Sequence, residues 1–168
     1  MQTNKPIEIN GQAIANGKFQ LICTPLVGRT LDMLMAELDV VLPKKPDVIE
    51  WRVDFFDQIE ATALVIAAAN AIKTRAFNIP LLFTRRSTME GGENIAMTES
   101  QVIAMYVAVC ESKSIDLIDY EMDNDAANIA QVRTVAKANG ITLVLSFHDF
   151  SYTPGTETLV AKFLTAEQ

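Results

Sequence analysis

Residues 47–54 read Asp47-Val-Ile-Glu-Trp-Arg-Val-Asp54 and alternate between apolar and charged side chains. In an extended strand the two kinds fall on opposite faces: Ile49, Trp51 and Val53 on one, and Glu50, Arg52 and Asp54 on the other. A half-exposed antiparallel strand would turn its charged face to solvent. In a parallel strand covered by helices, charged side chains need a polar environment, which a barrel supplies at the carboxyl ends of its strands. We therefore expect Glu50 and Arg52 to lie at a barrel mouth.

Short apolar segments alternate with segments of helical periodicity along the rest of the chain. Several of the apolar segments are nearly continuous in Ile, Leu, Val and Phe, as buried parallel strands are. The predicted strands are Phe19–Thr24, Val48–Val53, Leu81–Thr84, Ile115–Tyr120 and Thr142–Phe147. The predicted helices are Leu31–Leu42, Glu60–Ala76, Val102–Ser112 and Asp125–Asn139, with a last helix opening at Thr153-Pro154.

This order predicts an α/β fold. Asn10-Gly11 within residues 7–14 is a strong signal for an N-terminal β-hairpin. The strict strand–helix alternation that follows predicts parallel strands joined by right-handed crossovers, which fits a (β/α)8 TIM barrel or an open doubly wound sheet. We expect residues 1–168 to form a single, incomplete barrel domain of about five βα units. The doubly wound alternative predicts helices on both faces, with Glu50 and Arg52 on opposite sides from His148.

Composition excludes several classes of protein. The net charge of -7 argues against a general nucleic-acid binder, which needs a basic face. Cys23 and Cys110 have no metal-ligand spacing around them, so we expect free, buried thiols and no metal. The N-terminus lacks the apolar core of a signal peptide, and the stretch from Leu64 to Ile72 is too short to span a bilayer. We expect a cytoplasmic protein without a membrane segment.

Polar residues gather just after the later predicted strands. The third strand runs into Arg85-Arg86-Ser-Thr-Met-Glu90-Gly91-Gly92-Glu93. Asp119 and Glu121 share a face at the end of the fourth, where a helix-facing or solvent-exposed position fits them as well as a functional one. His148, the only histidine, follows the fifth strand, and an imidazole there titrates near neutral pH. These residues predict a cleft that binds a polar acid and carries out proton chemistry.

The same positions carry a family resemblance. The segments Glu50-Trp-Arg52, Leu81-Leu-Phe-Thr84 with Arg86-Ser and Glu90-Gly-Gly-Glu93, Ile118-Asp with Glu121, and Ser146-Phe-His148-Asp-Phe with Thr153-Pro154 resemble type I 3-dehydroquinate dehydratase. The resemblance extends from about Leu21 to the end of the chain, in the family's order and spacing.

The resemblance implies a homodimeric lyase of the shikimate pathway of aromatic amino acid biosynthesis, which leads to chorismate. It dehydrates 3-dehydroquinate, its small-molecule substrate, to 3-dehydroshikimate without a metal or organic cofactor. A lysine forms a Schiff base with the substrate ketone, and a histidine acts as general acid/base. Carried over, His148 is that histidine, Glu90 supports it, and Glu50, Arg52 and Arg86 bind the substrate.

The family's Schiff-base lysine lies on the sixth strand, and none of the lysines in this chain matches it. They are Lys5, Lys18, Lys44, Lys45, Lys73, Lys113, Lys137 and Lys162. Lys162 falls in the last predicted helix, where we expect it to be exposed. A five-strand arc also leaves two open edges. We therefore expect these 168 residues alone to be inactive, and poorly soluble or swapped into oligomers.

Three alternatives stay open. A non-catalytic, truncated relative would bind a shikimate-pathway acid without turning it over. An open doubly wound module would have no enzymatic role. A different Schiff-base barrel enzyme, such as an aldolase, fits the motifs less well.

Overall fold

The computed structural model describes residues 7–9, 12–15 and 21–166. Its main sheet has five parallel strands: β3 (Cys23–Leu26), β4 (Val48–Arg52), β5 (Leu81–Thr84), β6 (Leu117–Glu121) and β7 (Thr142–Ser146). The order of the strands across the sheet follows their order along the chain. Within the described residues β3 and β7 are the two edges, so the barrel is not closed.

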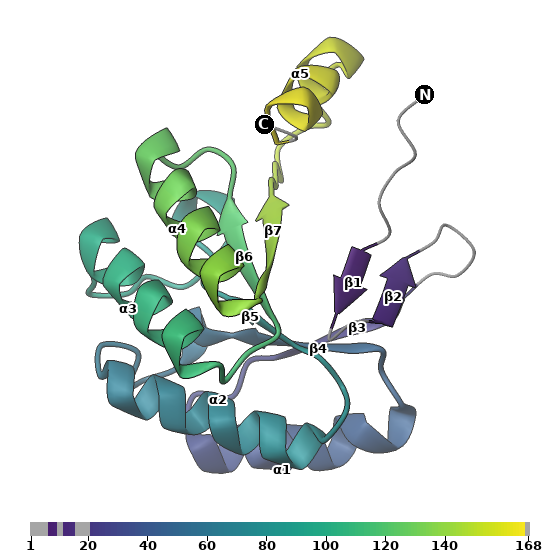
Figure 1. The fold of residues 1–168 in the computed structure, drawn as a ribbon, viewed down its shortest axis with the longest axis vertical. Coiled ribbons are helices and arrows are strands. Elements are labelled where there is room, and N and C mark those ends of the chain that lie inside the picture. Colours follow the sequence, from purple (N-terminus) through teal and green to yellow (C-terminus); the bar gives the residue numbers. More distant parts are fainter. Residues whose placement is uncertain (1–6, 10–11, 16–20, 167–168) are drawn as a thin grey trace.

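Helices connect the strands and cover the convex side of the sheet (Figure 1). They are α1 (Leu31–Val41), α2 (Thr62–Ala76), α3 (Glu99–Ser112) and α4 (Ala126–Asn139), and α5 (Thr156–Ala166) follows β7. Short 3-10 turns are η1 (Leu42–Lys44), η2 (Val53–Phe55) and η3 (Thr88–Glu90). A doubly wound sheet reverses its strand order and carries helices on both faces. This topology is instead that of a barrel wall, as predicted.

The helix ends follow the signals in the sequence. The Thr30 side chain accepts a hydrogen bond from the Met33 N–H, and Thr98 and Gln101 form a reciprocal capping box. Gly140 ends α4 with a φ of 73°, a conformation that glycine adopts without strain. None of the helices in the described residues is long and apolar enough to cross a membrane.

The N-terminal hairpin is confirmed. The short strands β1 (Ile7–Ile9) and β2 (Gln12–Ala15) pair antiparallel. The Asn10-Gly11 turn that predicted them lies outside the described residues.

A row of aromatic side chains fills the core between the sheet and α2 and α3. Trp51, Phe83, Tyr106 and Tyr120 meet edge to face in sequence, with ring centroids 5.6–5.7 Å apart. Such pairs contribute roughly 0.5–1.5 kcal/mol beyond the burial of their area. Trp51, Phe83 and Tyr120 belong to β4, β5 and β6, so their contacts help to fix the register of neighbouring strands.

Tyr106 of α3 also holds the strand ends where the polar residues begin. Its buried hydroxyl donates to the carbonyl of Asp119 at 3.0 Å and accepts from the Arg85 N–H at 3.2 Å. Burial raises the pKa of this hydroxyl well above its ordinary value, so it stays protonated and can donate. The core thus positions the carboxyl ends of β5 and β6.

Several predicted boundaries and exposures are wrong. The first barrel strand is Cys23–Leu26, because Asp47 and Val48 donate their N–H groups to the carbonyl of Ile22 and pairing starts there. Residues 19 and 20 of the predicted strand lie outside the described residues. Cys23 is exposed, since its strand is an edge, whereas Cys110 is buried as expected.

The last helix also differs from the prediction. It begins at Thr156, because its first backbone bond runs from the Leu159 N–H to the carbonyl of Gly155, so Pro154 lies before the helix. Lys162 is half-buried: its ammonium pairs with Asp123 and lies 3.9 Å from the centroid of the Phe147 ring. This cation–π contact draws the side chain out of solvent.

Candidate active site

Charged side chains line the inner, concave side of the sheet near its carboxyl edge. Arg52 pairs in register with Thr84, Thr84 with Asp119, and Glu121 with Ser146. Neighbours in register point to the same side of a parallel sheet. Arg52, Thr84 and Asp119 therefore form one polar row across three strands, and Glu121 and Ser146 form a second row two residues further along. The alternation read from residues 47–54 holds through Arg52, whereas Asp54 lies in the turn η2 that follows the strand.

Arg86 makes contact with polar side chains of both rows. Its side chain is 7% exposed and follows β5. Its Nη2 lies 3.1 Å from Asp119 Oδ1, and its Nη1 lies 3.3 Å from Glu121 Oε1 and 3.4 Å from Glu90 Oε2. Nη1 also donates to the Ser146 hydroxyl at 2.7 Å, and that hydroxyl donates to Asp119 at 2.9 Å. One guanidinium therefore joins segments from β5, β6 and β7.

Three carboxylates around one cation leave this cluster with excess negative charge. The pKa of Asp119 is raised from 3.8 to about 6, mainly by burial and also by nearby Glu50, against the opposing effects of Arg86, Ser146 and His148. Burial disfavours the charged form, and the guanidinium does not fully compensate. Asp119 therefore titrates closer to neutral pH than an ordinary aspartate does.

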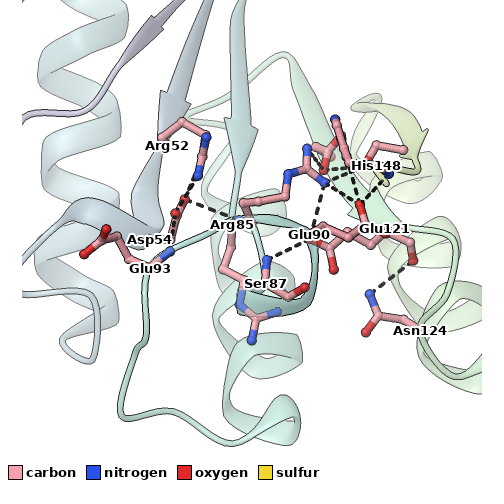
Figure 2. A network of polar contacts seen from close by, with 12 residues as sticks. Arg52, Asp54, Arg85, Ser87, Glu90, Glu93, Glu121, Asn124 and His148 are labelled. Carbon is pink, nitrogen blue, oxygen red and sulfur yellow. Dashed lines mark hydrogen bonds and ion pairs between the residues drawn. The ribbon is translucent and has the colours of Figure 1, made fainter. Parts of the chain in front are cut away.

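His148 and Glu90 form a hydrogen-bonded pair beside this cluster (Figure 2). His148 Nδ1 lies 2.8 Å from Glu90 Oε2, and the His148 backbone N–H donates to the same oxygen at 3.1 Å. The carboxylate is buried, while the imidazole is 39% exposed. Because a carboxylate accepts hydrogen bonds, this contact assigns the proton to Nδ1 and leaves Nε2 to a ligand.

The segment that carries Glu90 is a tight turn. The N–H groups of Glu90 and Gly92 both donate to the carbonyl of Ser87, at 3.1 and 2.7 Å. A Cβ at Gly92 would lie 2.0 Å from the carbonyl oxygen of Arg86, so only glycine fits there. The Ser87 N–H donates to Glu121 Oε1 at 2.7 Å, which ties the turn to β6.

Arg52 lies on the other side of the site. Its Nε and Nη2 donate to the two carboxylate oxygens of Asp54, at 2.9 and 2.8 Å. This hydrogen bonding raises the pKa of the guanidinium above its already high value, so Arg52 stays charged. The guanidinium carbon also lies 5.2 Å from the centroid of the Phe55 ring. Glu50, partly buried on the same strand, is close enough to affect the pKa values of Arg52 and Asp119.

A pocket of about 640 Å³ opens between the loops that follow β5, β6 and β7. Glu90, Glu121 and the loop of residues 147–151, which includes His148, belong to its walls. The three predicted substrate-binding residues, Glu50, Arg52 and Arg86, do not line it. In the described part of the chain, no group of His, Cys, Asp and Glu residues is arranged to hold a metal ion.

Comparisons with known proteins agree with this geometry. The sequence model of the family described as Type I 3-dehydroquinase matches residues 22–168. The chain belongs to the type I 3-dehydroquinase family. A 3-dehydroquinate dehydratase of Albidiferax ferrireducens is 70% identical over 168 residues, which are 100% of this chain and 64% of that protein. The chain thus spans somewhat less than two thirds of the length of this curated relative.

Solved structures of the type I 3-dehydroquinase family share the fold. The 3-dehydroquinate dehydratase of Geobacillus kaustophilus has a TM-score of 0.92 at 40% identity, covering 98% of this chain and 63% of that one. The type I enzyme of Clostridium difficile, solved with covalently modified comenic acid, has a TM-score of 0.93 at 28% identity. Its alignment covers 98% of this chain and 64% of the other.

The structure brings together most of the residues that the sequence singled out. His148 and Arg86 both contact Glu90, and Arg52 is joined to the Arg86 backbone through Asp54. The side chain of Glu50 makes no hydrogen bond within the described part of the chain, although its backbone pairs with β3 and β5. The sequence reading assigned no role to Asp54 or Ser146 and left Asp119 and Glu121 open. The sequence signal they share is their place at the carboxyl end of a predicted strand. Asp119, Glu121 and Ser146 lie on the strands, and Asp54 lies in the turn after one.

Proposed function

We propose that the protein dehydrates 3-dehydroquinate to 3-dehydroshikimate, as the names of its relatives indicate, in the shikimate pathway of aromatic amino acid biosynthesis. The observation that carries the proposal is the 2.8 Å contact between His148 Nδ1 and the buried carboxylate of Glu90. Elimination of water requires one group that removes a proton from carbon and returns a proton to the departing hydroxyl. A single imidazole of fixed orientation performs both steps.

In this proposal His148 is the general acid/base and acts through Nε2. Glu90 accepts from the Nδ1–H and the backbone N–H of His148, so the ring has one tautomer and one orientation. The carboxylate also stabilises the imidazolium that forms when Nε2 takes a proton. The half-exposed ring keeps Nε2 within reach of a ligand.

Glu50, Arg52 and Arg86 bind the substrate in this proposal. The guanidinium of Arg52 donates two of its five N–H groups to Asp54 and makes no other hydrogen bond in the described residues. Its remaining donors are suited to the hydroxyls or carboxylate of a polyhydroxylated acid. Arg86 uses its Nη groups on the protein, and its Nε–H has no partner within the described part of the chain.

We further propose that the reaction passes through a lysine Schiff base. The imine draws electrons from the neighbouring carbon and makes its proton removable. The covalently modified ligand in the Clostridium difficile relative supports covalent chemistry in this family. No lysine of the described residues contacts His148, Glu90 or Arg86. We therefore propose that the imine-forming lysine is none of the described lysines. Because the sequence places neither Lys5 nor Lys18 at the end of a strand, we also propose that the 168 residues alone are inactive.

The proposal also covers the domain organisation, the oligomeric state and the location of the protein in the cell. Residues 1–168 belong to one incomplete barrel domain, which the single sheet β3 to β7 supports. The expectations of a homodimer and of a cytoplasmic location rest on the family resemblance alone.

The test measures binding of 3-dehydroquinate by calorimetry and treats the mixture with borohydride before intact mass is recorded. We expect binding, which Arg52→Gln weakens about 10- to 100-fold because it removes charge-assisted hydrogen bonds. Arg75→Gln is the matched control, since Arg75 is exposed and pairs with Asp39 on the helical side.

The outcomes separate the parts of the proposal. Binding with the mass unchanged at 18.5 kDa supports the binding residues and a lysine elsewhere. A reduced adduct at that mass would show that one of the eight lysines present is the nucleophile. Absence of binding would refute the proposed function.

A further inference from the structure

Asp54 is buried at the point where β4 enters η2, and its carboxylate accepts four hydrogen bonds. Its side chain is 0% exposed. Oδ1 accepts from Arg52 Nε at 2.9 Å and from the Arg86 N–H at 3.3 Å. Oδ2 accepts from Arg52 Nη2 at 2.8 Å and from the Glu93 N–H at 3.1 Å. Four donors occupy the approximately four lone-pair sites of a carboxylate, so Asp54 has none left for a ligand.

The four donors belong to two different parts of the site (Figure 2). Two are on the side chain of Arg52, which reaches the inner face from β4. The other two are backbone N–H groups at the two ends of residues 86–93, the segment that carries Glu90. Asp54 therefore holds both ends of this segment and the Arg52 guanidinium through the same two oxygen atoms.

We infer that Asp54 is a positioning residue that fixes Arg52 and the Glu90-bearing segment relative to each other. The inference rests on the proposed function in one respect, the roles of Arg52 and Glu90 toward the substrate. Asp54 itself touches neither substrate nor reacting atoms. It sets the distance between the residue that binds the ligand and the pair that moves the proton, Glu90 and His148.

The geometry makes Asp54→Asn a sharp test. An asparagine keeps the shape but offers one carbonyl oxygen and one NH2 group. If the oxygen takes the place of Oδ1, the NH2 group faces Arg52 Nη2 and the Glu93 N–H. If it takes the place of Oδ2, the NH2 group faces Arg52 Nε and the Arg86 N–H. Either orientation therefore frees Arg52 on one side and one end of the segment, and no rotation of the amide preserves both.

Asp116→Asn is the matched control. Asp116 is also buried, accepts from the Leu81 N–H at 3.0 Å and pairs with Lys73 at 2.9 Å, at the amino end of β6. Both variants lose a buried carboxylate, and both are expected to lower the melting temperature. Only Asp54→Asn is expected to weaken 3-dehydroquinate binding in calorimetry, by about 10- to 100-fold. Equal affinities in the two variants would overturn the inference.

A second measurement needs no substrate, and its first part uses the wild-type protein alone. The Arg52 Nε–H should exchange slowly with solvent in the wild-type protein, because Asp54 Oδ1 holds it. Exchange at the rate of a free arginine would overturn the inference. In Asp54→Asn with selectively labelled histidine, the single His148 signal should shift, whereas in Asp116→Asn it should not. Slow exchange and a shifted signal, without binding by the wild type, would uphold the positioning role and refute the proposed function.

Discussion

Replacement of Arg86 by methionine tests the electrostatic account of the site most directly. The guanidinium is the cation that Asp119, Glu121 and Glu90 share, and its removal leaves three buried carboxylates without it. Loss of one partner from a buried ion pair costs about 3–5 kcal/mol. We expect Arg86→Met to lower the free energy of unfolding by about this amount at pH 8.

The pH dependence of this loss distinguishes electrostatics from packing. Without Arg86, which lowers the pKa of Asp119, that pKa rises further above its present value of about 6. A carboxyl whose folded pKa exceeds its unfolded value stabilises the fold at low pH, and this stabilisation is lost as the pH rises through the folded value. At pH 5 Asp119 is mostly protonated in both proteins, so the penalty of Arg86→Met should be smaller by about 1–2 kcal/mol.

Urea unfolding of the wild type and the variant at pH 5 and pH 8 measures both quantities. Arg75→Met is the control, because Arg75 pairs with Asp39 at the surface and exposed pairs contribute about 0–1 kcal/mol. A penalty for Arg86→Met that is the same at both pH values would refute the electrostatic reasoning. A penalty no larger than that of Arg75→Met would show that the cluster does not hold the strands together.

Three further predictions concern the surroundings of the site. The raised pKa of Asp119, from 3.8 to about 6, should make the wild type lose roughly 3 kcal/mol of stability between about pH 4 and pH 6, and urea titrations of Asp119→Asn should lack this loss. Gly92→Ala should cost about 1–3 kcal/mol in thermal unfolding, since its Cβ meets the Arg86 backbone, whereas Gly155→Ala, with nothing within 4 Å, should be neutral; equal effects would contradict the tight turn. Tyr106→Phe should cost about 1–3 kcal/mol in urea unfolding by leaving a buried N–H and a buried carbonyl unpaired, and a neutral result would exclude that anchor.

The strands and helices were predictable because each depends on neighbouring residues. Thr30 and Thr98 cap the helices that follow them, and the alternation around Trp51 gives the inner and outer faces of β4. The exceptions depended on distant contacts. Ile22 and Asp47 set the start of β3, and the sequence around Phe19 contains no sign of that pairing.

The site was predictable as a set of positions but not as a set of partners. His148, Glu90 and Arg86 stood out by residue type and by their place after apolar strands. The link from Arg52 to the 86–93 segment through Asp54 was not visible, because it depends on how far η2 bends back after the strand. The alternation of side chains along a strand identifies the residues on the inner face. Their contact partners become visible only in the folded structure.

The network around Arg86 has a kinetic consequence for folding. Its hydrogen bonds join residues far apart in sequence: Arg86 with Glu121 across 35 positions, Arg86 with Ser146 across 60, and Glu90 with His148 across 58. Closing such long loops costs entropy before any contact is gained, so contacts of this range form after the local strand–helix units. The His148 resonance should therefore reach its native position late in refolding, and it reports the completion of the sheet from β5 to β7.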